Sequence, residues 1–369
     1  MPVNVALGHV SNAFLIAALV MYSLSVVAFA GDFAFGRPRR AAAAREEQAQ
    51  DRTAALASVG AAGGPAAAPA GLAAAPGEPA VPGEPAAPGP APDRPAGRAG
   101  SMPELAVPAL RAIRQAGRWV LTAVLLSLAG VTAHTTAVVL RGLAVHRAPW
   151  GNMYEFVTAL TCVAAIFFLS AMIRYRAWTL GVFVMGAVVI ILGLAETLIY
   201  TAAGELVPAL QSYWLDIHVT ALTLATGIFF VAAVLGCVYL WADRYTRRVA
   251  AGRAAPGNGI VRRLPSIEQL DRLTYRTIVF GFPVWTFGVI AGAIWADQAW
   301  GKYWGWDPVE TWAFITWVLY AAFLHARATA GWRGRRAHYV QLLGFASLIF
   351  NILVVQVFIA GLHSYSGVS

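Results

Sequence analysis

The chain has 369 residues, of which 59% are hydrophobic and only 12% are charged. A soluble domain carries roughly 25% charged residues, so this composition excludes an ordinary soluble protein and favours one that resides in a lipid bilayer. The formal net charge of +9 invites a nucleic-acid-binding interpretation, but the basic residues lie between apolar segments and not on one tail or face. We therefore expect membrane lipid as a partner and no nucleic acid.

Apolar segments of roughly 20 residues, long enough to cross a hydrocarbon core of about 30 Å as helices, recur along the chain. The eight predicted spans are 11–34, 113–140, 154–173, 177–200, 214–241, 277–297, 308–328 and 338–362. The first span has no basic segment before it and no small-residue cleavage site behind it, so we interpret it as a retained anchor and not a signal peptide. The sequence thus predicts an all-α integral membrane protein with about eight transmembrane helices.

Arginines are concentrated in the connections after the first, third, fifth and seventh predicted spans. The positive-inside rule makes these four connections cytoplasmic, so both termini and the connections near 141–153, 201–213 and 298–307 are extracytoplasmic. The three external connections carry few Arg or Lys, as the rule requires. All seven connections therefore agree with one orientation in the plasma membrane.

The segment between the first two spans is rich in Ala, Pro and Gly and contains the near-repeat PGEPAVPGEPAAPGP. It has almost nothing aromatic or branched to bury, which predicts a long disordered cytoplasmic linker. The expected organisation is an N-terminal transmembrane anchor (1–36), this linker (37–107) and a seven-helix domain (108–369). The two cysteines lie in different spans and no C-x-x-C occurs, so the sequence encodes no disulfide framework or thiol redox motif.

Residues 297–317, DQAWGKYWGWDPVETWAFITW, hold five tryptophans, a tyrosine and four ionisable side chains. Interfacial Trp and Tyr anchor many membrane proteins, but anchoring alone does not need this density. Asp307 and Pro308 fit a helix start, with Glu310 at the capping-box position. The preceding external loop, within 297–313, would then present a shelf of large flat faces that suits a porphyrin.

This shelf consists of Trp300, Trp304 and Trp306. A porphyrin is flat and apolar and carries two propionates, which Lys302 or a nearby N–H group could meet. Two glycines in the same loop would let backbone and rings approach such a flat ligand closely.

Two histidines lie at the same membrane level as the tryptophan loop. His218 is near the outer end of the fifth span and His363 is at the outer end of the eighth. Ionisable residues inside membrane helices are candidates for function, and two imidazoles at one level can supply both axial bonds of a haem iron. The alternative for each is a polar residue at the membrane interface.

His325 lies 17 residues beyond Pro308 on one predicted helix, hence about 25 Å lower at roughly 1.5 Å per residue. It cannot share an iron with the outer pair, so it either serves a second, inner haem site or is an interfacial histidine beside Arg327. His134 and His146 could be spare ligands or propionate partners, although packing histidines are as consistent with the sequence.

These residues resemble a known family. WGKYWGWDPVETWAFITWVLYAAFLH resembles the tryptophan-rich "WWD" signature of haem-handling proteins. APWGNMYEF, LVPALQSYWLDIHV, HARATAGWRGRR and GLHSYS are similar to the CcsA branch, called CcsB or ResC in Gram-positive bacteria, of the system II cytochrome c maturation machinery. The resemblance covers roughly residues 110–369 and leaves out the first span and the linker. It departs at Val309, where relatives often carry a charged residue.

The resemblance implies cytochrome c biogenesis by a subunit of a cytochrome c synthase (haem lyase). Such a protein binds haem b non-covalently, moves it to the outer face and presents it for thioether attachment to the C-x-x-C-H motif of apocytochrome c. The implied partners are a ResB/CcsB-type membrane subunit, apocytochrome c and a thioredoxin-like apocytochrome reductase. His218 and His363 match the external haem ligands, and His325 matches the inner ligand, whose counterpart the partner supplies. The other implied haem contacts are Trp300, Tyr303, Trp304, Trp306, Asp307 and Trp312.

Three alternatives remain at this stage. A system I haem-handling protein shares the tryptophan signature but pairs with a covalent haem chaperone. A b-type electron-transfer cytochrome would show buried histidine pairs at matching depths on facing helices, and a small-molecule transporter would bind no haem. Because attachment is largely a matter of positioning thiol and vinyl groups, the absence of a hydrolytic motif from the sequence is expected for a synthase.

Overall fold

A computed structural model describes residues 3–35, 113, 115–204, 212–254, 260–329 and 331–363. The predicted linker, 37–107, lies outside these residues. The described residues form helices and turns, and eight of their helices are long and apolar enough to cross a membrane. This confirms the prediction of an all-α, multi-pass membrane protein. The side of the membrane on which each end lies stays a prediction.

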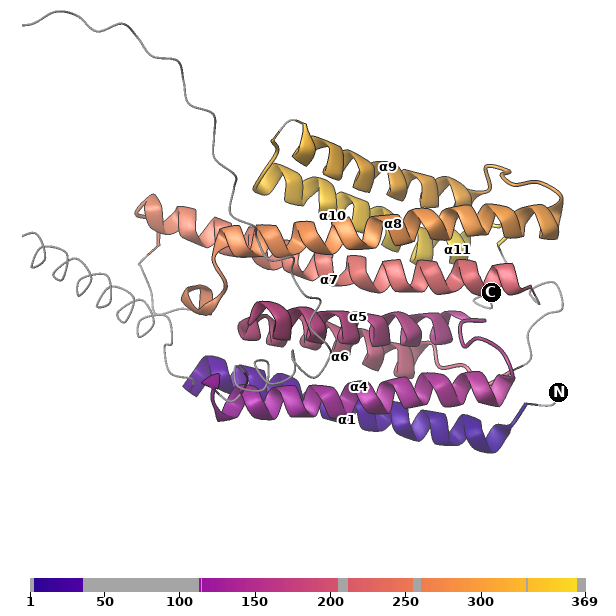
Figure 1. Cartoon of the computed structure of the whole chain (residues 1–369), viewed down its shortest axis with the longest axis horizontal. Coiled ribbons are helices and arrows are strands. Elements are labelled where there is room, and N and C mark those ends of the chain that lie inside the picture. The colour runs from indigo at the N-terminus through magenta and orange to yellow at the C-terminus, as the bar shows by residue number, and fades with distance from the viewer. Residues whose placement is uncertain are drawn as a thin grey trace, which may run out of the picture. The chain divides into compact units, whose positions relative to one another are not determined.

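Figure 1 colours the helices by their order along the chain. They are α1 (Val5–Phe35), α4 (Arg118–Val145), α5 (Met153–Tyr175), α6 (Gly181–Leu198), α7 (Tyr213–Ala250), α8 (Ile267–Trp300), α9 (Pro308–Ala328), α10 (Arg335–Phe350) and the short α11 (Gln356–Phe358). The bounds of α9 coincide with the predicted span. Helices α7 and α8 extend well beyond their predicted spans into the polar connection between them.

Helix α7 occupies the middle of the bundle and separates two groups of helices (Figure 1). Its Val231 and Leu235 belong to a core shared with α1, α4, α5 and α6. Its Phe229 belongs to a second core with α8, α9 and α10, where the ring stacks on Tyr320 of α9 with centroids 3.9 Å apart. The position of α7 therefore decides where side chains from both groups meet.

Helix α1 packs along the whole of α4. A methyl group added at Gly130 would lie 2.5 Å from the ring of Tyr22, and one added at Gly31 would lie 2.7 Å from Trp119. These close approaches bury Tyr22 completely. The first span thus contributes to the helical core, whereas the expected division into anchor, linker and seven-helix domain stays a prediction.

The two ends of the bundle differ in chemistry. One end, called here the histidine end, holds His218, His363, the α4–α5 connection and the α8–α9 loop; Ser212 donates to Gln298 there at 3.3 Å. The other, called the arginine end, holds the end of α9, where Arg327 binds Asp271. Helices traverse the bundle alternately, so consecutive connections fall at opposite ends (Figure 1).

The eighth predicted span, 338–362, corresponds to the helical segment Arg335–Phe358, which is long and apolar enough to cross a membrane but ends before His363 and is not a regular α-helix throughout. Helix α10 ends at Phe350, a π-helical turn spans Asn351–Val355, and the chain leaves helical geometry after α11. The reason is a long-range contact: the backbone N–H of Leu362 donates to Asp307 at 2.6 Å, which pulls the chain back onto the start of α9. π-helical turns are rare and often occur near functional sites.

Candidate functional site

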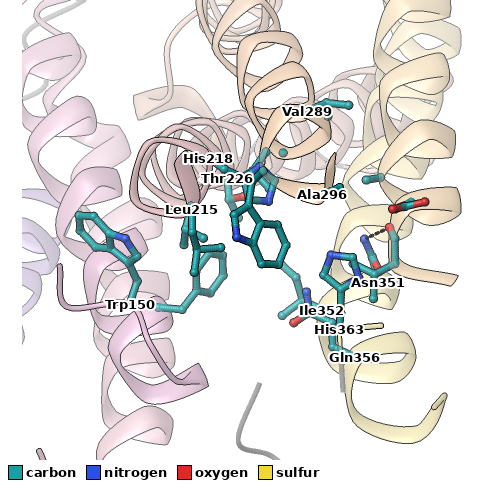
Figure 2. A pocket seen from close by; sticks show the side chains of 18 of the residues that line it. Trp150, Leu215, His218, Thr226, Val289, Ala296, Asn351, Ile352, Gln356 and His363 are labelled. Carbon is teal, nitrogen blue, oxygen red and sulfur yellow. Dashed lines mark hydrogen bonds between the residues drawn. The ribbon is translucent and has the colours of Figure 1, made fainter. Parts of the chain in front are cut away.

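A pocket opens at the histidine end between α5, α7, α8, α9 and the α10–α11 segment. About 1400 Å³ of empty space, part of it open to the surroundings, lies within it. Both predicted external histidines line it. Figure 2 shows Trp150 and Leu215 on one side, His363, Asn351 and Gln356 on the other, and His218 between them in this view.

His218, on the second turn of α7, is held by α8. Its Nδ1 lies 2.7 Å from the carbonyl oxygen of Gly288, and because a carbonyl only accepts, Nδ1 carries the proton and Nε2 carries the lone pair. Gly292 lies one turn further along α8, where an added methyl would come within 2.5 Å of the imidazole. Gly292 thus leaves a slot for this ring, and the carbonyl of Gly288 fixes its orientation.

His363 is held by the start of α9. Its Nδ1 lies 2.8 Å from Oδ2 of Asp307, so this histidine also carries its proton on Nδ1. Burial alone raises the pKa of Asp307, but hydrogen bonds from His363 and from the backbone of Leu362 and Val309 outweigh burial and hold the pKa below its usual value. The ionised carboxylate therefore orients the imidazole, as carboxylates do behind metal-ligating histidines.

The loop before α9 is constrained by the predicted capping box, which is confirmed. Oε2 of Glu310 accepts from the backbone of Asp307 at 3.1 Å and of Gly305 at 2.8 Å. Gly301 ends α8 in the left-handed region, with φ of +70°, which glycine adopts without strain. The glycines were expected to let a flat ligand approach; Gly301 instead serves the turn, and the side chain of Lys302 lies over Gly305.

Three of the predicted loop aromatics line the pocket: Trp300, Tyr303 and Trp304. The structure does not bring the other two to its wall. Trp306 is 65% exposed and meets the edge of Trp304, with centroids 5.8 Å apart. Trp312 faces α10, where its ring packs on that of Phe350 with centroids 4.4 Å apart. The start of α9 explains both positions. Trp306, just before the helix, has a positive φ of 55° and points outward, and Trp312 lies on the face of α9 that meets α10.

Trp295 is a pocket residue that the sequence did not single out. Its indole is 2% exposed and lies nearly parallel to the His218 ring, with centroids 6.4 Å apart and planes at 12°. Its ring also lies edge to face with the rings of His363 and Trp300, with centroids 6.2 and 4.8 Å away. One buried aromatic side chain therefore contacts both external histidines.

The α4–α5 connection supplies a further wall of the pocket, through Arg147 and Trp150. Glu155 holds this wall in place: it accepts from Arg147 at 2.8 Å and from Arg141 at 3.0 Å. The sequence did not single out Arg147 or Trp150 as pocket residues. His146, in the same connection, caps the end of α4 in the left-handed region and is exposed.

The matched part of the chain corresponds to a known family. Residues 150–363 match the Cytochrome C assembly protein family. The chain is 35% identical over 245 residues to a cytochrome c biogenesis protein CcsA of Heterosigma akashiwo, which covers 59% of this chain and 76% of the relative. The chain belongs to the CcsA family.

Two other relatives agree with this assignment. The CcsA of Guillardia theta is 36% identical over 234 residues, covering 59% of this chain and 76% of the relative. The CcsA of Gloeobacter violaceus is 34% identical over 268 residues, covering 60% and 79%. Among solved structures, the cytochrome c haem lyase CcmF matches 67% of this chain and 43% of its own, with a TM-score of 0.46 and 20% identity. Membership in the CcsA family places this membrane protein in cytochrome c biogenesis.

The remaining histidines of this CcsA-family chain lie away from the pocket. His325 is exposed on the last turn of α9, at the arginine end. His134 is fully buried between α1 and α4, with Nδ1 3.4 Å from the hydroxyl of Tyr22. His338, for which the sequence indicated no chemistry, is fully buried and lies 3.2 Å from Asp271.

Proposed function

We propose that this protein holds haem b non-covalently in the pocket, with the iron between His218 and His363, and presents it for covalent attachment to apocytochrome c. One observation carries the proposal. In both histidines Nδ1 donates to an oxygen, the Gly288 carbonyl or the Asp307 carboxylate, so both imidazoles are in the tautomer that ligates through Nε2. Such acceptors behind a ligand fix its orientation and raise its basicity.

The other walls fit the same ligand. Trp295 and Trp300 offer large apolar faces beside the two imidazoles, and Trp304 and Tyr303 extend them toward the pocket mouth. Bound haem supplies the iron that the imidazoles ligate and the two vinyl groups that react. We assign Trp306 and Trp312 a supporting role in the packing of the loop and of α9.

Haem is the substrate in this account, and the protein's contribution is position. Each cysteine thiol of the C-x-x-C-H motif adds across one vinyl group: its S–H bond breaks, a C–S and a C–H bond form, and no group leaves. Holding the reactants together can lower such a barrier by about 7–11 kcal/mol in favourable cases without a protein nucleophile. The motif's histidine then replaces either His218 or His363 at the iron.

The remaining parts of the proposal concern topology and partners. Because arginine is dense at the arginine end, we infer that this end is cytoplasmic, that the histidine end, both termini and the pocket are extracytoplasmic, and that the linker 37–107 is cytoplasmic. The exposed His325 would be one ligand of an inner haem site whose second ligand comes from a ResB/CcsB-type membrane subunit. A thioredoxin-like reductase would keep the apocytochrome thiols reduced.

The test is co-expression with a ResB-type subunit and a C-x-x-C-H reporter, followed by measurement of covalent haem on the reporter. We expect His218→Ala and His363→Ala each to abolish most of the signal. His9→Ala is the matched control, because His9 is exposed on α1 at the same end of the bundle. Undiminished covalent haem in the His218→Ala/His363→Ala double variant would contradict the proposal.

A further inference from the structure

A second groove lies toward the arginine end, where α5 and α8 pass on either side of α7 (Figure 1). Its buried floor includes Val231 and Leu235 of α7. Phe167 of α5 and Phe280 of α8 stack across it, with ring centroids 5.9 Å apart. The groove encloses about 1010 Å³ of empty space and opens to the surroundings, and its interior is almost entirely apolar.

Two arginines stand at this groove. Arg174, at the end of α5, and Arg276 of α8 both line it, and their guanidinium carbons lie 5.8 and 5.5 Å from the centroid of one ring, that of Tyr175. Within the described residues, neither guanidinium has a carboxylate at ion-pair distance. Two like charges are thus gathered around a single tyrosine, and no carboxylate among the described residues pairs with either of them.

Some of the other arginines at the same end pair with carboxylates. Arg327 binds Asp271 through two hydrogen bonds of 2.8 and 2.9 Å, and Arg247 pairs with Asp243 at 3.2 Å. Other arginines at this end, among them Arg176 and Arg272, also have no carboxylate at ion-pair distance within the described residues, so the pair at the groove is set apart by its shared tyrosine and by the apolar cavity beside it. Basic clusters next to a cavity between transmembrane helices bind anionic lipid headgroups.

The geometry points to a binding site for an anionic phospholipid, with the phosphate between Arg174 and Arg276 and an acyl chain in the groove. A phosphate suits this place because each guanidinium offers a planar fork of donors to its oxygens. The ligand also needs an acyl chain, because the interior of the groove is apolar. Phe167 lies seven residues before Arg174 on α5, hence about 10 Å deeper along the helix, which is room for the first part of a chain.

The site does not depend on haem binding, so it can be tested on the purified full chain. The protein would be extracted in mild detergent, mixed with micelles that contain either phosphatidylglycerol or phosphatidylcholine, and examined by native mass spectrometry for retained lipid. We expect retention of phosphatidylglycerol over phosphatidylcholine, and a loss of roughly tenfold in Arg174→Gln/Arg276→Gln.

The matched control is Arg176→Gln/Arg272→Gln. Arg176 and Arg272 are also exposed at the arginine end but do not line the groove, so this variant changes the net charge equally. It should retain phosphatidylglycerol as the unchanged protein does. Equal losses in both double variants would mean attraction by general charge only and would overturn the assignment, as would equal retention of the two lipids.

A third variant separates a phospholipid from a free anion. Ala171 lines the groove on α5, and Ala171→Trp should fill the space of the acyl chain and reduce lipid retention although both arginines remain. Unchanged retention in this variant, or full displacement of the lipid by millimolar inorganic phosphate, would show that only the phosphate is recognised and would overturn the proposal. Thermal unfolding of each variant establishes that it is folded.

Discussion

Asp307 joins the start of α9 to His363: its carboxylate accepts from Nδ1 of His363 at 2.8 Å, from the backbone of Leu362 at 2.6 Å and from the backbone of Val309 at 3.2 Å. One side chain therefore caps a transmembrane helix and orients a proposed haem ligand. The position of His363 depends on the helix start and not on the helix that precedes it in the chain.

Asp307→Asn tests this connection. The amide can still cap α9 through its oxygen, but it provides no charge to stabilise the Nδ1 proton of His363, so the imidazole becomes a weaker ligand. We expect haem affinity to fall by about 10- to 100-fold, which is typical for the loss of a partner behind a metal ligand. Titration of the purified apoprotein with haem measures it, and an unchanged dissociation constant would exclude the orienting role.

The lowered pKa of Asp307 has a consequence for stability. A carboxyl group whose pKa is lower in the folded state stabilises the fold above its unfolded pKa, about 3.9 for aspartate. That stabilisation is lost only as the pH falls through the lower folded value. The difference in unfolding temperature between the unchanged protein and Asp307→Asn should therefore stay constant from pH 7 to about pH 4 and shrink below it. A difference that vanished already near pH 6 would show that another group is responsible.

Gly292→Ala should displace His218. The added methyl would lie 2.5 Å from the imidazole, too close to be accommodated without movement of the ring. We expect a marked loss of haem binding with the fold intact, measured by absorption at the haem Soret band. Gly186→Ala and Gly193→Ala on α6 are matched controls, since nothing lies within 4 Å of either position. Equal haem binding in all three variants would contradict the slot described for His218.

The ion pair between Arg327 and Asp271 should matter for stability. The side chains are only 9% and 13% exposed, so Asp271→Asn leaves a largely buried guanidinium without its counter-charge, at a cost of about 3–5 kcal/mol. Asp243→Asn breaks a pair with the 49% exposed Arg247, for which we expect about 0–1 kcal/mol. Thermal unfolding in detergent compares the two, and similar shifts would indicate that the Asp271 pair is effectively solvated.

His325→Ala tests the proposed inner haem site and leaves the outer pocket unchanged. His325 is exposed and distant along α9 from the pocket, so the variant should bind added haem at the outer pocket as the unchanged protein does. Co-expressed with a ResB-type subunit, however, it should carry less haem and yield less covalent cytochrome c. Normal cytochrome c yield with this variant would remove His325 from the account.

The sequence predicted the features that depend on local patterns. Apolar length indicated all eight spans, and the Asp-Pro-x-Glu pattern indicated the start of α9 with its capping box. His218 and His363, which were predicted to share a level because each lies near the outer end of a predicted span, line the same pocket.

The missed features depend on contacts between distant parts of the chain. Trp295 lies inside an apolar span, where nothing local distinguishes it from a packing aromatic residue. The fold-back of His363 requires Asp307, 56 residues earlier, and the π-helical turn at Asn351 has no sequence signature. Basic residues precede His338 in the sequence, yet the helices around it bury it beside Asp271.

The most direct test of the central claim is the electron paramagnetic resonance spectrum of the purified protein loaded with ferric haem. Two imidazole ligands predict a low-spin signal. When either His218 or His363 is replaced by alanine, the signal should change to high spin, and added imidazole should restore the low-spin signal. A low-spin signal that persists unchanged in the variant lacking both histidines would show that haem is held elsewhere and would contradict the account.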